Sequence, residues 1–192
     1  MSTPAGYWHV VPSAGAAIHW AAIDAESLAK NLCAGSLYAI LDAARHRDVL
    51  AMLCEPGVAY WSLYDGRAAQ QMADVAPYLI DLRRDPRRLH DFIENGWGDF
   101  WGFYLHSNAE PDEVRSHLRH FTMVRLEDGD EVFFRFYDPR VLRPFLEFIE
   151  PGDGKKFFGP IKRIFCEGDT GATVFRFEPL SADAGSGAEK RG

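Results

Sequence analysis

The stretch Leu37-Tyr38-Ala39-Ile40-Leu41-Asp42 decides the fold, because it is a short apolar run that stops abruptly at a carboxylate. Five consecutive apolar residues are typical of a strand that is buried on both faces. A helical pattern follows over residues 43–54 and is broken by Pro56-Gly57. Residues 58–64 then predict a second buried strand, so the chain begins to alternate strands with helices.

The same alternation continues through the middle of the chain. A short helix near residues 68–72 leads to a third strand over residues 78–82. Asp85-Pro86 and Glu110-Pro111 each place proline at the first position of a helix, where its missing N–H costs nothing. The aromatic-rich run at residues 100–105, between these two helices, predicts a fourth strand.

The pattern changes in the last third of the chain. Residues 122–126 and 132–137 flank Asp128-Gly129, which is a turn signature for a β-hairpin. A helix is predicted over residues 141–149, and two last strands over 161–167 and 173–178. Strands separated by helices favour βαβ units with right-handed crossovers. The predicted fold class is therefore α/β, with a mixed sheet built from βαβ units, an antiparallel hairpin extension, and helices packed on the sheet.

Three regions are expected along the chain. Residues 1–35 form an N-terminal segment with a short helix over residues 24–34, and residues 36–180 form the main domain. Residues 181–192 are small and polar, which predicts a disordered tail.

Composition excludes several classes of protein. The chain has 192 residues and a hydrophobic content of 47%, which is enough for one domain with its own core. Its formal net charge of −7 makes it a poor partner for nucleic acid, since phosphate binding depends on cationic side chains. It contains no run of about 18 apolar residues that would predict a transmembrane helix, and no signal peptide is recognisable. Three dispersed cysteines, Cys33, Cys54 and Cys166, suit a reducing compartment, so we expect a cytoplasmic protein without a membrane partner.

Four aspartates stand at or near the ends of predicted strands: Asp42, Asp65, Asp81 and Asp138. In a parallel sheet, the carboxyl ends of the strands share one edge, and carboxylates gathered there would suit Mg²⁺ and phosphoryl chemistry. A magnesium-dependent phosphohydrolase or nuclease is therefore one hypothesis. Capping and turn roles explain the same residues more simply and are favoured.

The most unusual stretch is residues 133–140, because it places Arg135 between aromatic residues inside a predicted strand. An arginine that is even half buried is costly unless a carboxylate or carbonyl group satisfies it. Asp138 and Asp42 are the candidate partners. Two interpretations remain open: a structural ion pair that joins strand to helix, or an anchor for the backbone of a binding partner.

No catalytic constellation is recognisable. The sequence has no nucleophile elbow and no Walker loop, and Gly96-Trp97-Gly98-Asp99 lacks the spacing of a dinucleotide loop. His117 and His120 lie three residues apart on a helix, without an evident third metal ligand. We therefore predict a protein that acts by binding another protein, with no cofactor and no catalytic residue. Aromatic residues that stay exposed would favour such an interface.

Five sequence elements resemble, in their order, the domain of unknown function 4123 over about residues 36–168. The resemblance rests on residues 37–44, 60–66, 76–79, 135–140 and 157–160, which read LYAILDAA, YWSLYDG, APYL, RFYDPR and FFGP.

The resemblance implies an adaptor chaperone of the bacterial type VI secretion system. Such an adaptor binds a cognate toxic effector in the cytoplasm and helps to load it onto the VgrG spike. Many members of the family continue into a C-terminal lobe, whereas this sequence shows one further strand and a polar tail beyond residue 168. A stand-alone interaction module unrelated to secretion is a third hypothesis. The residues that match the family's motifs, and so mark the expected partner-binding region, are Tyr38, Asp42, Arg135, Tyr137, Asp138, Pro139 and Arg140.

Overall fold

A computed structural model describes residues 18–23, 32, 36–83, 85–126, 128–169 and 171–179. The predicted N-terminal helix over residues 24–34 lies almost wholly outside this described part, and so does the predicted tail over residues 181–192. No helix in the described ranges is long and apolar enough to cross a membrane.

Nine strands are described, and seven of them form one sheet. The sheet contains β1 (Ile18–Ile23), β2 (Leu37–Asp42), β3 (Tyr60–Ser62), β4 (Pro77–Asp81), β5 (Gly102–Ser107), β8 (Ile161–Glu167) and β9 (Val174–Pro179). A separate two-stranded sheet contains β6 (Met123–Arg125) and β7 (Glu131–Phe133). The helices are α2 (Arg47–Leu53), α3 (Gly66–Gln71), α4 (Pro86–Gly96), α5 (Pro111–Arg119), α6 (Pro139–Phe148) and α7 (Pro151–Phe158), with the short 3₁₀ helix η1 (Ala73–Val75).

The seven strands follow the order β1-β9-β8-β5-β2-β4-β3, which places β2 between β5 and β4. Every neighbouring pair in this sheet is antiparallel. The predicted α/β class, with helices packed on a sheet, is confirmed, and so is the C-terminal hairpin of β8 and β9. The structure corrects one detail of the prediction, because no two neighbouring strands in the described sheet are parallel.

The helical crossovers explain how the sequence pattern led to this detail. The chain passes from β2 through α2 to β3, and from β4 through α4 to β5. In both crossovers the joined strands point the same way, but an antiparallel strand lies between them: β4 in the first and β2 in the second. The crossovers are therefore split βαβ units. The two units interlock, because β4 of the second unit lies between β2 and β3, and β2 of the first unit lies between β4 and β5.

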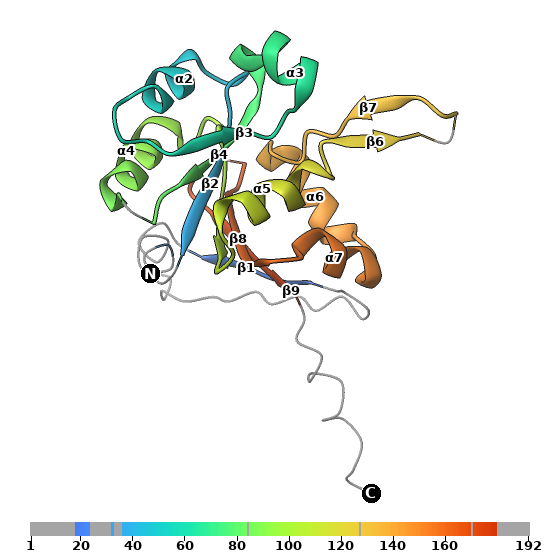
Figure 1. The fold of residues 1–192 in the computed structure, drawn as a ribbon. Coiled ribbons are helices and arrows are strands. Elements are labelled where there is room, and N and C mark those ends of the chain that lie inside the picture. Colours follow the sequence, from blue (N-terminus) through green and yellow to red (C-terminus); the bar gives the residue numbers. More distant parts are fainter. Residues whose placement is uncertain are drawn as a thin grey trace, which may run out of the picture.

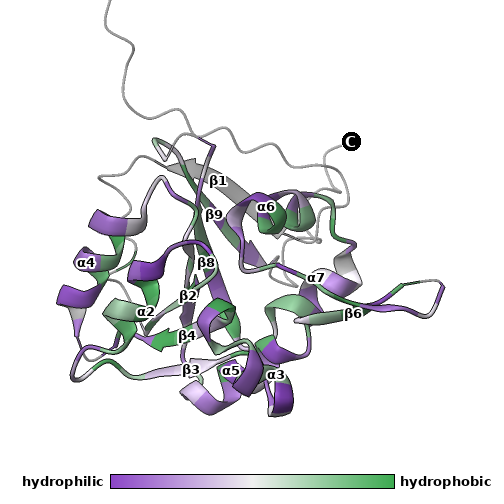
Figure 2. Ribbon diagram, turned by 90° about the horizontal axis from the view of Figure 1, so that it is seen from above, coloured by the Kyte–Doolittle hydropathy of each residue, from purple (hydrophilic) through white to green (hydrophobic). Residues whose placement is uncertain are grey.

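Helices cover both faces of the sheet, so the molecule has three layers (Figures 1 and 2). Tyr38 and Ile40 face a layer of α5, α6 and α7, whereas Ala39 and Leu41 face α2 and α4. All six residues of β2 are buried as a result. This double coverage is the reason for the uninterrupted apolar run, since neither face of the strand meets water.

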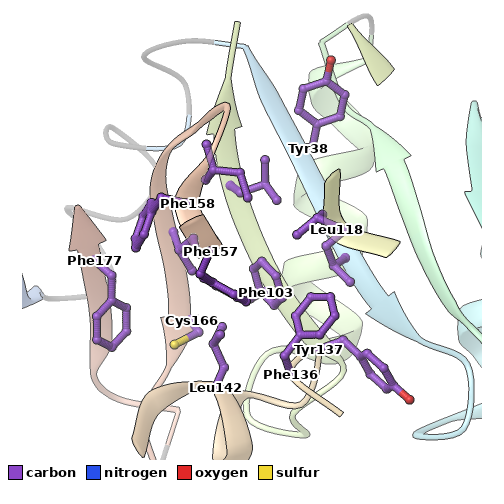
Figure 3. Close-up of a cluster of buried hydrophobic side chains, with 14 of the residues drawn as sticks. Tyr38, Phe103, Leu118, Phe136, Tyr137, Leu142, Phe157, Phe158, Cys166 and Phe177 are labelled. Carbon is purple, nitrogen blue, oxygen red and sulfur yellow. The ribbon is translucent and has the colours of Figure 1, made fainter. Parts of the chain in front are cut away.

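The layer of α5, α6 and α7 is held by a cluster of aromatic side chains. The ring of Phe136 lies 6.4 Å from that of Phe103 on β5 and 5.8 Å from that of Phe157 on α7, between ring centres. Figure 3 shows these rings packed together, with Tyr38 and Tyr137 at opposite ends of the cluster. Aromatic pairs at such distances add to the free energy of burial.

β1 and α7 are larger elements that were not anticipated from the sequence. β1 precedes the predicted domain boundary at residue 36, yet it pairs with β9 along all six of its residues. α7 begins at Pro151 and contains Gly152 and Gly154, a composition that is unfavourable for a helix. Its burial of Phe157 and Phe158 in the core supplies the stability that its first turn lacks.

Gly102 is a point at which the sheet admits no side chain. A Cβ atom on this residue would lie 1.8 Å from the carbonyl oxygen of Ile40, which is backbone and cannot rotate away. We expect Gly102→Ala to lower the free energy of unfolding by about 3 kcal/mol, as overpacking does in a rigid core. Urea unfolding followed by circular dichroism measures this loss.

Gly152→Ala is the matched control, because the same added methyl group meets no atom within 4 Å. Gly152 lies in α7, where alanine is the better helix former by roughly 1 kcal/mol. The control should therefore be at least as stable as the wild type. Equal stability of the two variants would contradict the close β2–β5 packing.

Candidate functional site

The candidate site begins at Asp42, the last residue of β2. Its side chain is 0% exposed. The carboxylate accepts a hydrogen bond from the backbone N–H of Ala44 at 3.0 Å and one from Nη2 of Arg135 at 2.6 Å. The sequence left Asp138 and Asp42 as candidate partners for Arg135, and the structure selects Asp42. The Arg135 side chain is 47% exposed, so it joins a buried charge to the molecular surface.

Tyr137 and Tyr64 extend this pairing into the core. Their hydroxyl oxygens lie 3.0 Å apart, and the guanidinium carbon of Arg135 lies 5.8 Å from the centre of the Tyr137 ring. Burial raises the pKa of Tyr64 and that of Tyr137 above the ordinary value of a phenol. Both hydroxyl groups therefore stay protonated at neutral pH, where they act as hydrogen-bonding groups and not as nucleophiles.

Asp138-Pro139-Arg140 forms the second half of the site at the start of α6. Asp138 is the N-cap and accepts hydrogen bonds from the backbone N–H of Arg140 at 3.0 Å and from its Nε and Nη2 at 2.9 and 2.5 Å. Burial acts to raise the pKa of Asp138, but the hydrogen bonds and charge of Arg140, with the charge of Arg45, outweigh it and lower the pKa. Pro139 is buried at the first helical position. Asp42, Arg135, Asp138 and Arg140 are called the aspartate–arginine cluster below.

A loop between α4 and β5 borders this cluster. Phe100 in this loop has a positive φ of 57°, which is uncommon for a residue with a side chain, and the guanidinium of Arg140 lies 5.2 Å above its ring. The buried carboxylate of Glu167, at the end of β8, accepts hydrogen bonds from the backbone N–H groups of Gly98 and Phe100 at 2.6 and 2.9 Å. Glu167 therefore fixes the backbone of the loop, and with it the position of the Phe100 ring that the guanidinium of Arg140 stacks on.

A third arginine approaches from the turn that follows β2. Nη2 of Arg45 donates to the carbonyl oxygen of Asp99 at 3.0 Å. Its Nε atom is buried and has no hydrogen-bond partner in the part of the chain that the structure describes. Three guanidinium groups thus surround two buried carboxylates, and the surface of the cluster offers hydrogen-bond donors.

The strand-end aspartates do not gather at one edge of the sheet, as the magnesium hypothesis required. Asp42 pairs with Pro77 and Tyr38 pairs with Asp81 across β2 and β4, so Asp42 and Asp81 lie at opposite ends of the sheet. That hypothesis fails because it assumed parallel neighbours, whereas these two strands are antiparallel. The four carboxylates instead contact four different arginines: Arg135 at Asp42, Arg119 at Asp65, Arg83 at Asp81 and Arg140 at Asp138. In the described ranges, no three His, Cys, Asp or Glu residues lie close enough to share a metal ion.

Tyr38 is the one predicted site residue that lies apart from the others. It stands near the beginning of β2, where its hydroxyl donates to the carbonyl oxygen of Ala109 at 2.7 Å and its ring lies 5.1 Å from the guanidinium of Arg83. Burial raises its pKa to about 12. A surface cavity of about 630 Å³ also lies away from the cluster, and its lining includes His106, Arg163 and Glu178 but none of the predicted site residues.

Sequence reasoning missed four parts of this site: Arg45, Tyr64, Phe100 and Glu167. Arg45 lies in the turn after β2, whereas the other three reach the cluster from strand ends or loops that are distant in the sequence. The one available signal was at Phe100, which follows Gly96-Trp97-Gly98-Asp99, a glycine-containing loop with no helix or strand pattern of its own.

These features define a three-layer α/β protein with a buried aspartate–arginine cluster at one end of its central strand. The family model for the domain of unknown function DUF4123 matches residues 37–153, which is more than half of the chain. The chain therefore belongs to the DUF4123 family, and the resemblance drawn from the sequence is confirmed. The matched region runs from β2 into α7 and contains the whole aspartate–arginine cluster. No curated protein and no solved structure matches the chain.

The pairing of Asp42 with Arg135 predicts a coupled loss of stability. We expect Arg135→Gln to lower the free energy of unfolding by about 2 kcal/mol, because Asp42 then keeps a buried charge without its charged donor. Adding Asp42→Asn should recover part of that loss, since a neutral amide needs no counter-charge. A double-mutant cycle by urea unfolding measures the coupling.

Arg87→Gln provides the control for this cycle. Arg87 lies on α4, is almost fully exposed and contacts Asp85 at the surface, so its loss should change stability by less than about 0.5 kcal/mol. Strictly additive effects of Arg135→Gln and Asp42→Asn would show that the two side chains do not interact.

Glu167 predicts a second dependence, this time on pH. Burial raises its pKa from 4.5 to about 7, although the N–H groups of Gly98 and Phe100 act in the opposite direction. The native state therefore holds this proton more tightly than the unfolded chain does. The contribution to stability is complete below pH 4.5 and is lost as the pH rises to 7, by up to about 3 kcal/mol.

Glu167→Gln should remove this dependence, since the amide does not titrate and its oxygen still accepts from the loop. Urea unfolding of both proteins at pH 5.0 and pH 7.5 tests the effect. The difference in unfolding free energy between the two pH values should be smaller in the variant. An identical pH dependence in both proteins would refute the role assigned to Glu167.

Proposed function

We propose that this chain is an adaptor chaperone that binds a cognate type VI secretion effector in the cytoplasm and helps to load it onto the VgrG spike. Membership of the DUF4123 family supports the proposal, because proteins of this kind are linked to that role. In this function the chain acts by binding, without a cofactor or a catalytic residue. Its partners are the effector and the spike, and neither nucleic acid nor a membrane takes part.

The observation that carries the proposal is the presentation of Arg135 and Arg140 at the surface. Each side chain is about half exposed, at 47% and 46%, and each is fixed from below by a buried aspartate. A guanidinium group has five N–H donors, and the bonds to Asp42 and Asp138 occupy only some of them. The remaining donors suit backbone carbonyl groups or carboxylates of a bound polypeptide.

The buried aspartates make these arginines better anchors than free surface arginines would be. A long side chain normally loses rotamer freedom when it is immobilised in an interface. The ion pair with Asp42 and the N-cap bonds of Asp138 fix that geometry before binding, and the rings of Tyr137 and Phe100 support it. The two interpretations of Arg135, as a structural ion pair and as an anchor for a partner, are therefore compatible. The ion pair with Asp42 orients the guanidinium that the partner would bind.

Gene neighbourhood separates this proposal from a stand-alone interaction module. A gene for a spike protein or a toxin beside the gene for this chain supports the secretion role, and the neighbouring toxin then supplies the binding partner for experiments.

The test is co-expression with the effector encoded by the adjacent gene. The two proteins should co-purify, and deletion of the adaptor should abolish secretion of that effector. Arg140→Lys should weaken binding by about tenfold, because lysine keeps the charge but loses the planar fork. Calorimetry with purified proteins measures this change.

Arg87→Lys on α4 is the matched control and should bind as the wild type does, since it makes the same substitution at an exposed site on the helix layer opposite α6. Absence of co-purification, together with normal effector secretion in the deletion strain, would exclude the adaptor role.

A further inference from the structure

The hairpin of β6 and β7 projects away from the sheet and from the helices that cover it (Figure 1). This element, with the turn between its strands, is called the hairpin arm. All six residues of its strands are exposed, and no third strand joins it in the described part of the chain. A two-stranded hairpin without a packed face is marginally stable in water, so the arm gains little from its own burial.

The arm nevertheless carries most of the exposed large apolar side chains of the described residues. Eight such residues are found, and five of them belong to the arm: Met123, Val124, Leu126, Val132 and Phe133. Strands that are exposed on a protein surface normally avoid such a composition, because it invites pairing with other chains. Their concentration here indicates a surface that is covered by a partner.

The register of the arm divides these side chains between two faces. Met123 lies opposite Phe133, whose ring contacts that of Tyr64 at 5.0 Å between centres, so this face turns toward the body of the protein at its base. The other face has Val124 opposite Val132, and Leu126 continues the same alternation toward the turn. These three side chains are 37–45% exposed and form the outer apolar face.

Charge indicates the chemistry of the partner. The sequence from Arg125 to Glu131 contains one basic and four acidic residues. Arg125 is paired with Glu131, whereas Asp128 and Asp130 lie exposed in the turn beyond the outer apolar face. An apolar strand surface bordered by exposed carboxylates complements an apolar segment bordered by lysine or arginine.

We propose that the hairpin arm binds an extended segment of the effector that carries alternating apolar residues next to lysine or arginine. The segment adds a strand to the arm, places its apolar side chains on Val124, Val132 and Leu126, and directs its basic residues to Asp128 and Asp130. The inference rests on the proposed adaptor function and names the partner chemistry that this function requires. Strand addition of this kind takes affinity from main-chain hydrogen bonds and specificity from alternate side chains.

The position of the arm links it to the aspartate–arginine cluster. Phe133 at its base and Arg135 in the cluster are two residues apart, and Phe134 between them packs on Phe145 at 4.9 Å between ring centres. The base of the arm therefore lies next to Arg135, and one extended polypeptide can reach from the arm to the cluster.

The test uses the full chain and the effector encoded by the adjacent gene. The double variant Val124→Thr and Val132→Thr keeps β-branched side chains in the strands but makes the outer face polar. It should bind about tenfold more weakly or worse, as loss of a central apolar contact does. Circular dichroism and thermal unfolding should match the wild type, because both residues are exposed.

The matched control is Arg125→Thr with Glu131→Thr, which alters a cross-strand pair on the opposite face and leaves the net charge unchanged. Its affinity should stay within about twofold of the wild type.

The carboxylates of the turn are tested separately. Asp128→Asn with Asp130→Asn should weaken binding severalfold at low salt. The same variant should have little effect at about 0.5 M salt, because exposed charges are screened at that concentration. An array of overlapping effector peptides should give binding only for segments with alternating apolar residues and a basic flank.

Three results would overturn the inference in distinguishable ways. If the wild type binds the effector and the threonine variant binds equally well, the arm makes no contact and only this inference fails. If the wild type is a dimer that the threonine variant converts to a monomer, a second copy covers the arm. If the wild type does not bind the effector at all, the adaptor function fails as well.

Discussion

The burial of β2 on both faces is the constraint on which the other features depend. A strand between two helical layers must be apolar along its whole length, and the first polar residue can stand only where the layers end. That residue is Asp42, and its carboxylate still has no exposed surface. A buried carboxylate requires donors, and the chain supplies one from residue 135, more than ninety positions later. The aspartate–arginine cluster is thus a consequence of where the apolar run of β2 stops.

Local signals predicted the kinds of element well, but not the order of the strands. Proline at the first helical position correctly marked α4 and α5, and Asp128-Gly129 marked the hairpin. The apolar run of β2 shows that both of its faces are buried but does not identify its neighbours, so parallel and split crossovers look alike in the sequence. β1 and α7 were missed for a related reason. The pairing of β1 with β9 spans almost the whole chain, and α7 depends on the burial of Phe157 and Phe158 more than on helix propensity.

The same distinction applies to the site. Arg135 could be assigned a carboxylate partner because an arginine among aromatic residues is costly without one, and that reasoning needs only the local sequence. The contacts of Tyr64, Phe100 and Glu167 depend on which strand ends meet, so no local pattern reveals them. The magnesium hypothesis failed at the same point. It required Asp42 and Asp81 to share an edge of the sheet, and the antiparallel pairing of β2 with β4 places them at opposite ends.

The segment from Phe133 to Arg140 joins the exposed arm to the buried cluster through side chains as well as through the backbone. The ring of Phe133 contacts Tyr64, the hydroxyl of Tyr64 pairs with that of Tyr137, and the ring of Tyr137 lies beside the guanidinium of Arg135. In the proposed function, a polypeptide bound at the arm would contact residues that pack directly against those holding Arg135. Because these contacts are already formed, Arg135 would need little further ordering on binding. A partner long enough to reach both the arm and the arginines would gain contacts at both for one loss of translational freedom, so the proposed surface would favour a long extended segment over a short apolar one.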